Sequence, residues 1–433
     1  MQADHDKAMT ARQTGASGAK WAMGALLLVG SVAAHAVTIT MSCGTTGDGY
    51  EQCKRDTQVW AKKTGNTVQY LSMPQSSTEQ LSLYRRMFAA RSSGADVLQV
   101  DVVWPGMIKD HLIDLTPYAK GADKQMFPAT IRNNTVDGKL LAMPAFIDSG
   151  MLYYRKDLLE KYKLAVPKTW AELTRDAQLI QDGERKSGHK DFWGYVFQGK
   201  AYEGLTCDAL EWVHSYGGGT IVDAKGDITI NNPKAAAALD MAAGWVGRIA
   251  PPGVLNYAEE DARGLFQSGN AAFMRNWSYA WALGQGKDSP IRGLIGVAPL
   301  PAGPDGPSTS AQGGWQLGVS RYSKHPAEAA DLVMFMTSQA LQKQAAINGA
   351  TTPTYPDLYK DKDVLAAQPF MGEMYSVFIN TTPRPSSVTG LKYNEVSQIF
   401  WNGVSDVLSG RTTGAKAVQA MDVKLRQVKR RGW

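Results

Sequence analysis

Strand-like and helix-like segments alternate between residues 37 and 103. Residues 37–41, 68–71 and 96–103 have the composition of strands. A helix that runs to Trp60 and a second helix over 78–91, with apolar residues at helical spacing, separate them. The third strand is mostly apolar, as a sheet buried on both faces requires. This order predicts a largely parallel α/β layer.

The chain becomes richer in predicted helices beyond residue 150, and at 433 residues it is too long for one typical core. Two α/β lobes with crossing connections fit the pattern better than two domains in tandem. The sequence predicts helices over 157–162, 169–187, 233–246 and 259–269, an exposed loop over 303–309, and strands over 293–299 and 315–320.

The N-terminus has the pattern of a secretory signal peptide. Basic residues from Lys7 to Lys20 precede an apolar run over 21–34 and the small residues of Ala34-His35-Ala36. We therefore expect cleavage near Ala36 and a soluble periplasmic protein. The alternative is a retained N-terminal anchor, but the run is short and interrupted by glycine. Cys43 lacks the preceding residues expected of a lipidated cysteine.

The formal net charge of +6 is spread along the chain. This argues against a nucleic-acid partner. The densest basic run, 424–431, also fits the solvated end of a last helix, where cations suit the helix dipole.

Three cysteines are present, Cys43, Cys53 and Cys207. No histidine stands at ligand spacing from any of them, so we expect no metal site. Export permits disulfides, and the spacing of Cys43 and Cys53 allows one between a strand end and the next helix. The sequence leaves open whether that bridge forms.

Catalytic and cofactor motifs are absent or incomplete. Residues 194–201 have the glycine and lysine spacing of a phosphate-binding loop, but Ala201 stands where a hydroxyl would hold magnesium. The glycine-rich turn over 44–49 lacks the dinucleotide fingerprint, and Asp48 would repel a phosphate. We expect no cofactor.

Aromatic and acidic residues in polar settings indicate carbohydrate binding instead. Trp277 and Trp315 stand beside glycine, serine and asparagine, although most tryptophans serve core packing. Asp101 closes an apolar strand, and ligands of open α/β sheets bind beyond the carboxyl ends of strands. Carboxylates and arginines bind sugar hydroxyls by strong hydrogen bonds.

Several segments resemble the periplasmic solute-binding proteins of carbohydrate ABC importers, in particular the trehalose/maltose-binding branch. The resemblance covers nearly the whole chain after residue 36, and its most specific segments are 133–139, 143–150, 152–158, 193–205, 269–281 and 382–385. It implies a two-lobed α/β periplasmic binding protein fold of type II, with the ligand cleft between lobes joined by a multi-segment hinge. The expected lobes are 37–145 plus 301–350 and 146–300 plus 351–433.

The resemblance also implies the role of eight residues. Glu51, Asp101, Asp148 and Arg384 would bind sugar hydroxyls; Trp277, Tyr279 and Trp315 would stack on sugar rings, and the Gly314 backbone would approach closely. Two of them have alternatives, since Glu51 can serve a helix N-terminus and Arg384, between two prolines, can pin a loop. One position departs from the family, because Leu81 stands where relatives usually carry an arginine that contacts the sugar.

The expected function is capture of an α-linked disaccharide, maltose or trehalose, by lobe closure, without catalysis. The partners would be the sugar and a membrane permease with its ATPase, and the protein would be a monomer. One alternative is the same fold with another neutral sugar or a polyol. The other is a secreted glycosidase, which would also need paired carboxylates and aromatic platforms.

Overall fold

The computed structural model describes residues 36–43, 48–74, 76–430 and 432–433. The predicted signal peptide therefore lies outside the described residues, apart from Ala36, as does most of the glycine-rich turn over 44–49. Within the described part of the chain, no helix is long and apolar enough to cross a membrane.

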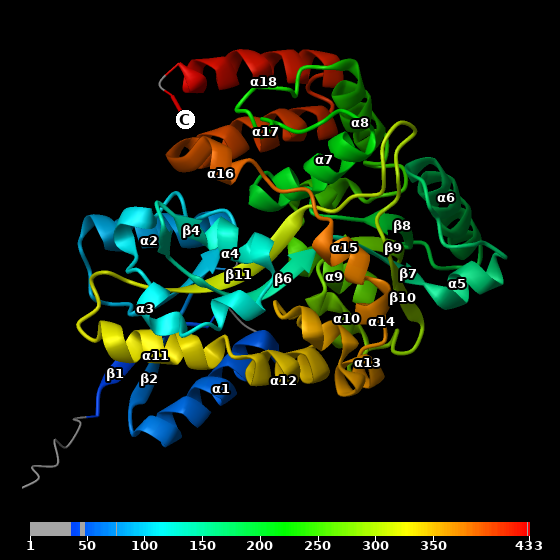
Figure 1. Ribbon diagram of the computed structural model, residues 1–433. Coiled ribbons are helices and arrows are strands. Elements are labelled where there is room, and N and C mark those ends of the chain that lie inside the picture. The colour runs from blue at the N-terminus through cyan, green and yellow to red at the C-terminus, as the bar shows by residue number, and fades with distance from the viewer. Residues whose placement is uncertain (1–35, 44–47, 75, 431) are drawn as a thin grey trace, which may run out of the picture. The chain divides into compact units, whose positions relative to one another are not determined.

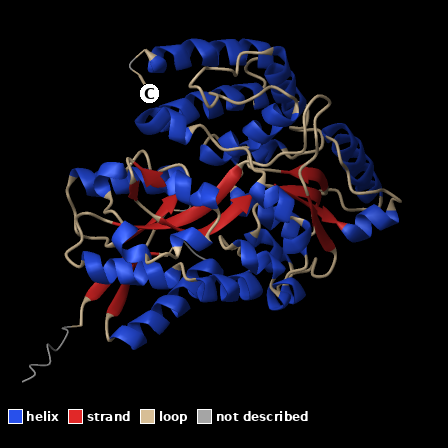
Figure 2. Ribbon diagram, viewed as in Figure 1, coloured by secondary structure: helices blue, strands red, loops and turns tan. Residues whose placement is uncertain are grey.

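A five-stranded sheet contains the strands predicted near the N-terminus (Figures 1 and 2). β2, β1 and β3 are parallel, as expected, but β11 runs antiparallel to both of its neighbours, β3 and β6. Because β6 is antiparallel to β11, it is parallel to β3, and of the five strands β11 alone is reversed. The prediction of a largely parallel layer is therefore confirmed, with β11 entering the sheet from the opposite end. In spatial order the strands are β2 (Thr67–Leu71), β1 (Thr38–Ser42), β3 (Val97–Asp101), β11 (Gln312–Val319) and β6 (Met143–Ser149).

A second sheet of four strands is also mixed. β7 pairs antiparallel with β10 and β9, whereas β8 is parallel to β9. Its order is β10 (Ile295–Ala298), β7 (Met151–Arg155), β9 (Ala271–Asn276) and β8 (Trp193–Val196), and a separate hairpin joins β4 (Thr135–Val136) to β5 (Lys139–Leu140).

The chain crosses between the two sheets rather than completing one before the other. Gly150 alone connects the end of β6 to the start of β7. The chain returns to the first sheet between β10 and β11. The prediction of crossing connections is confirmed.

Helices cover both sheets (Figure 1). Those beside the first sheet are α1 (Asp48–Thr64), α2 (Ser77–Ala89), α3 (Thr116–Ala119), α4 (Pro128–Asn134), α11 (Pro326–Met336) and α12 (Gln339–Gly349). Beside the second lie α5 (Lys156–Lys161), α6 (Trp170–Lys186), α7 (Glu203–Ser215), α8 (Pro233–Ala243), α9 (Glu259–Gln267) and α10 (Tyr279–Gly284). The C-terminal helices are α13 (Lys362–Ala367), α14 (Phe370–Glu373), α15 (Tyr375–Ile379), α16 (Ser386–Thr389), α17 (Tyr393–Leu408) and α18 (Gly414–Lys429). Short 3₁₀ turns occupy Lys109–His111, Asp123–Gln125, Pro252–Asn256, Pro356–Lys360 and Gly390–Lys392.

Capping residues fix where several of these helices begin. Thr169 and Glu172 form a reciprocal capping box at the start of α6, which satisfies two backbone N–H groups that the helix cannot pair. Asn232 accepts a hydrogen bond from the Ala235 N–H, 2.9 Å away, before Pro233 opens α8.

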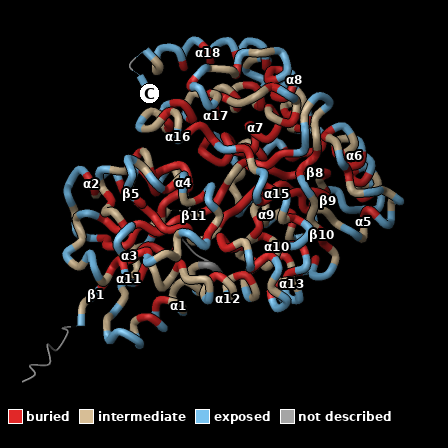
Figure 3. Tube along the Cα trace, in the orientation of Figure 1, coloured by how far each residue is buried: buried red, intermediate tan, exposed pale blue. Residues whose placement is uncertain are grey.

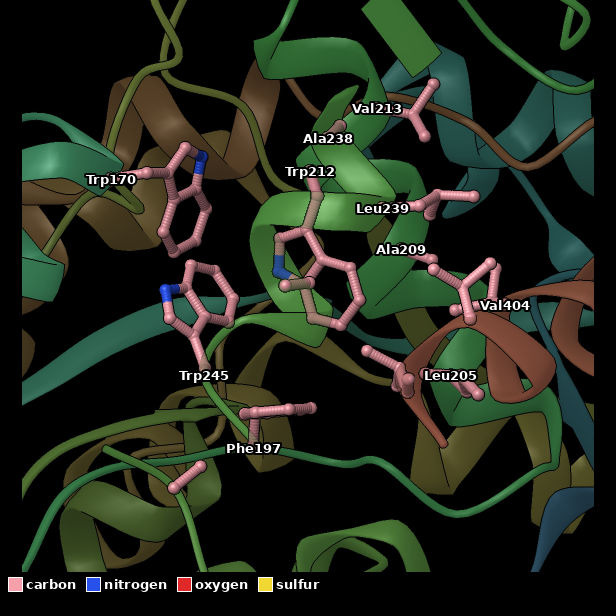
Figure 4. Packing of buried hydrophobic residues seen from close by; sticks show 14 of the residues in the cluster. Trp170, Phe197, Leu205, Ala209, Trp212, Val213, Ala238, Leu239, Trp245 and Val404 are labelled. Atoms are coloured by element: carbon pink, nitrogen blue, oxygen red, sulfur yellow. The ribbon is translucent and has the colours of Figure 1, made fainter. Parts of the chain in front are cut away.

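Both faces of the second sheet are buried. Side chains alternate between the two faces along each strand, so neighbouring residues belong to different hydrophobic clusters. Leu152 and Phe273 pack with α6, α7, α8 and α17 on one face, whereas Met151 and Met274 belong to the cluster on the other. On the first face, the ring centroid of Trp245 lies 5.5 Å from that of Trp170 and 5.8 Å from that of Trp212 (Figure 4). Figure 3 shows the buried residues along the strands and the exposed ones on outer helix faces such as that of α18.

A disulfide joins Cys43, just after β1, to Cys53 in α1. The sulfurs belong to residues ten positions apart, so the bridge closes a short loop in the unfolded chain. The remaining cysteine, Cys207, is buried and free.

We expect the double variant Cys43→Ser/Cys53→Ser to lower the free energy of unfolding by about 2.7 kcal/mol, since the unfolded chain regains the entropy that this loop had lost. Urea denaturation with and without a reductant measures the effect. The reductant should destabilise only the wild-type protein, since Cys207 forms no bridge. An unchanged denaturation midpoint in the double variant would contradict the prediction.

Candidate ligand-binding site

Asp101, Gly314 and Trp315 lie together where β3 ends and β11 begins. Trp315 pairs with Asp101 across the two strands, and the Val102 N–H donates to the Gly314 carbonyl over 3.2 Å. Gly314 has a φ of 118°, and a Cβ added there would lie 2.5 Å from the Phe146 carbonyl oxygen. The position therefore requires glycine, for both its backbone angle and the closeness of β6.

Arg384 connects groups from the two sheets. Its guanidinium donates to Glu203 Oε1 at 2.7 Å, to Asp101 Oδ1 at 3.4 Å and to the Gln312 carbonyl at 3.2 Å. Asp101 ends a strand of the first sheet, and Glu203 begins α7, which packs beside the second. The three side chains are at least nine-tenths buried. Arg384 thus forms an ionic link between the two halves of the structure.

Two more side chains hold Glu203 in place. The Tyr393 hydroxyl donates to Oε1, and the Ser397 hydroxyl donates to Oε2 over 2.7 Å. Arg384 Nε, by contrast, is buried and has no hydrogen-bond partner among the described residues. One strong donor of this cluster is therefore left for a ligand or a water molecule.

Burial raises the pKa of Asp101 to about 6, and the neighbouring Arg384 charge opposes the rise. The pKa of Asp148 is also about 6, raised by burial and held down in part by hydrogen bonds from the Ser278 and Ser149 backbone. Carboxylates that bind hydroxyls must be ionised to accept two bonds each, so both groups are competent acceptors near neutral pH.

Asp148 and Trp277 lie side by side against β11. Asp148 Oδ1 accepts from the N–H groups of Ser149 at 2.9 Å and Ser278 at 3.1 Å. A Cβ added to Gly313 would meet Trp277 Cζ3 at 2.8 Å and Asp148 Cβ at 3.2 Å. The indole of Trp277 is half-buried, and its Nε1–H points to Glu259 Oε1, 3.4 Å away.

Tyr279 joins this group only indirectly. Its hydroxyl donates to Glu260 Oε1 over 2.6 Å, next to the Glu259 that meets Trp277. Tyr202 also donates to Glu259, over 2.6 Å. The first turn of α9 therefore orders three aromatic side chains by hydrogen bonds.

Glu51 and Leu81 are placed differently. The Glu51 carboxylate is exposed near the start of α1 and pairs with Lys54 at 3.4 Å. Leu81 is buried in the cluster of Tyr84 and Trp104, so its side chain packs in the core. Gln80, the neighbouring polar residue, donates to the Pro74 carbonyl at 2.8 Å, and its buried Oε1 has no hydrogen-bond partner within the described part of the chain.

The site contains groups that sequence reasoning missed, namely Glu203 with its partners and Trp104, whose ring meets that of Trp315 edge-on at 5.5 Å. Glu203 lies within a segment that carries the family resemblance, but nothing in its spacing indicates a partner 181 positions away.

Two surface hollows, of about 530 and 550 Å³, contain none of the eight predicted residues. Within the described residues, no group of three or more potential metal ligands is present.

Comparisons with known proteins place the chain in a family. A family model for bacterial extracellular solute-binding proteins matches residues 48–343. A probable ABC transporter-binding protein of Deinococcus radiodurans is 54% identical over 402 residues, which cover 92% of this chain and 96% of that protein.

Solved structures agree. The maltose-bound T. maritima MalE3 has a TM-score of 0.86 and 40% identity, covering 91% of this chain and all of that one. The GacH receptor of Streptomyces glaucescens GLA.O has a TM-score of 0.80 over 91% of this chain and 98% of its own, and at 23% identity it shows likeness of fold alone. The chain belongs to the bacterial extracellular solute-binding proteins and has their two-lobed α/β fold.

Proposed function

We propose that this protein is the substrate-binding component of an ABC sugar importer and that it captures an α-linked disaccharide, maltose or trehalose. It acts in the periplasm after removal of residues 1–36, as a monomer, and delivers the sugar to a membrane permease with its ATPase. It catalyses no reaction. The 40% identity with a maltose-bound protein supports the choice of sugar class.

The observation that carries the proposal is that Arg384 contacts acidic side chains from both halves of the molecule. A sugar held there would be within reach of a carboxylate from each half of the molecule, Asp101 and Glu203. The half-buried rings of Trp277 and Trp315 supply the flat apolar surfaces that sugar C–H groups need. Glu51 and Tyr279 stay in the proposed site as further groups for the sugar.

The proposed mechanism is capture by lobe closure. The proposed lobes are 37–145 plus 301–350 and 146–300 plus 351–433, and the first crossing of the chain, at Gly150, lies a few residues beyond the first of these bounds. Asp101, Asp148 and Arg384 are 5–7% exposed, so a disaccharide reaches them only when the lobes separate. Contacts made only in the closed state then favour closure around the sugar.

Calorimetric titration of the refolded, sugar-free protein tests the proposal directly. Maltose, trehalose, sucrose, glucose and mannitol are added in turn, and products of hydrolysis are sought in parallel. Saturable binding of maltose or trehalose without turnover supports the proposal, and the sugar should raise stability by about 2.7 kcal/mol at about a hundred times its dissociation constant. Binding of mannitol alone would change the cargo, and turnover would indicate a glycosidase.

The variant Trp277→Ala should weaken disaccharide binding about 30-fold, as expected for removal of a stacking ring at the centre of an interface. Its fold should persist, because the ring is only half-buried. Trp193→Ala is the matched control, since Trp193 is also half-buried over an arginine, Arg185, at 4.4 Å. Equal affinities of wild type and Trp277→Ala would remove this residue from the site.

A further inference from the structure

Arg275, in β9, forms a buried ion cluster with two acids of α7. Its guanidinium donates to Glu211 at 2.6 and 2.9 Å and lies 3.1 Å from Asp208 Oδ1. Its remaining terminal nitrogen donates to Gln198 Oε1 at 3.1 Å. The three charged side chains are at most 1% exposed. A bidentate pair of this kind has one geometry, so the plane of the guanidinium is fixed.

The same guanidinium lies against the face of the Trp277 ring. Its central carbon is 4.0 Å from the ring centroid. The indole N–H points to Glu259, and Gly313 leaves room for the ring edge only because it lacks a Cβ. Arg275 therefore covers one face of the ring, and the ring orientation depends on the plane of that guanidinium.

The ion cluster also supports both strands that cross between the sheets. The Ala311 N–H donates to Glu211 Oε1 over 3.0 Å, just before β11. A Cβ added to Gly150 would lie 2.6 Å from Arg275 Nη2 and closer still to Glu211 Oε1. The Ser310 hydroxyl donates to the Gly150 carbonyl over 2.6 Å, which ties the two crossings together. Both crossings thus rest on the pair that supports the ring.

We infer that the Arg275–Glu211 pair is a positioning centre that couples the two crossing strands to the orientation of the sugar-stacking ring Trp277. The inference rests on the proposed function only in taking Trp277 as a ring that stacks on the sugar. The effect of Arg275 on the orientation of that ring does not depend on the proposed function. Neither Arg275 nor Glu211 touches the sugar. A rotation of the crossing strands as the lobes open acts on Glu211 through Ala311, and on the ring through Arg275.

Ring orientation is tested first, without any sugar. The protein is labelled with fluorotryptophan, and the fluorine NMR signal of Trp277 is assigned by its loss in Trp277→Phe. We expect Glu211→Gln and the milder Ser310→Ala to shift this signal. Glu184→Gln should leave it in place, since Glu184 is a buried acid whose partners are Lys161, Tyr162 and His189, none of them at the ring or the crossings. A Trp277 signal unmoved in the Ser310→Ala and Glu211→Gln proteins would overturn the inference.

A double-mutant cycle then tests the effect on binding. Glu211→Gln should weaken maltose binding about tenfold in the wild-type background and less than about twofold in the Trp277→Ala background, because its effect passes through the ring. Equal losses in the two backgrounds would mean that Glu211 acts only on general stability. If Glu211→Gln fails to fold, Ser310→Ala replaces it in the cycle with the same expected pattern. Failure of the wild-type protein to bind any sugar would overturn the proposed function, whereas the fluorine signal would still decide the positioning role.

Discussion

Replacing Arg384 by methionine should lower the free energy of unfolding by about 3–5 kcal/mol at pH 7, because the change leaves buried carboxylates without their cation. The affected groups are Asp101 and Glu203, each of which Arg384 now contacts. The same variant should lose sugar binding. Urea denaturation and calorimetric titration measure the two effects.

The loss of stability in Arg384→Met should shrink as the pH falls. Arg384 now lowers the pKa of Asp101 against the effect of burial, so its removal raises that pKa further and the carboxyl becomes neutral at a higher pH. The second change Glu203→Gln should restore part of the stability at pH 7. Arg411→Met is the control, because its side chain is 62% exposed and its pair with Asp406 contributes little. A loss no larger than that of the control would show that Arg384 does not neutralise the cluster.

Asp148→Asn should stabilise the protein, by about 3 kcal/mol at pH 7. The folded pKa of Asp148, about 6, lies above the ordinary value of 3.8. Between these two pH values the folded state binds more protons than the unfolded state, so stability falls as the pH rises through this window. Asparagine cannot ionise, and its side-chain oxygen can still accept from the Ser149 and Ser278 N–H groups.

The gain from Asp148→Asn should therefore disappear below about pH 4, and thermal unfolding across the pH range measures this. Asp191→Asn, at an exposed position, is the control variant. We expect the stabilised variant to bind sugar more weakly, because an amide is a weaker acceptor than a carboxylate. A gain in stability that does not change with pH would exclude ionisation of Asp148 as its cause.

The elements of the chain were predictable where local periodicity determines them. The helix predicted over 169–187 is α6, Trp170–Lys186, and the helix predicted over 259–269 is α9, Glu259–Gln267. The direction of β11 was not predictable, because pairing with β3 and β6 depends on the path of more than a hundred intervening residues. Local patterns carry no information about that path.

The residues of the candidate site also differ in how far the sequence predicts them. Asp101, Gly314 and Trp315 meet because they lie on neighbouring strands, and Asp148 and Trp277 meet at two strand ends. The groups that support them come from distant parts of the chain. Arg275 and Glu211 are 64 positions apart, and only the packing of α7 on the second sheet brings them together. Buried polar partners of this kind leave no spacing signal in a single sequence.

The order of strands in the first sheet has a consequence for when the chain can fold during its synthesis. β11 lies between β3 and β6, yet it follows them after the whole of β7 to β10. A growing chain therefore cannot complete its N-terminal sheet until residue 319 has been synthesised, and until then β3 and β6 each have an unpaired edge. Pairing of such high sequence separation is slow. Under the export proposed above, this delay would keep the nascent polypeptide unfolded during the period in which it can be exported.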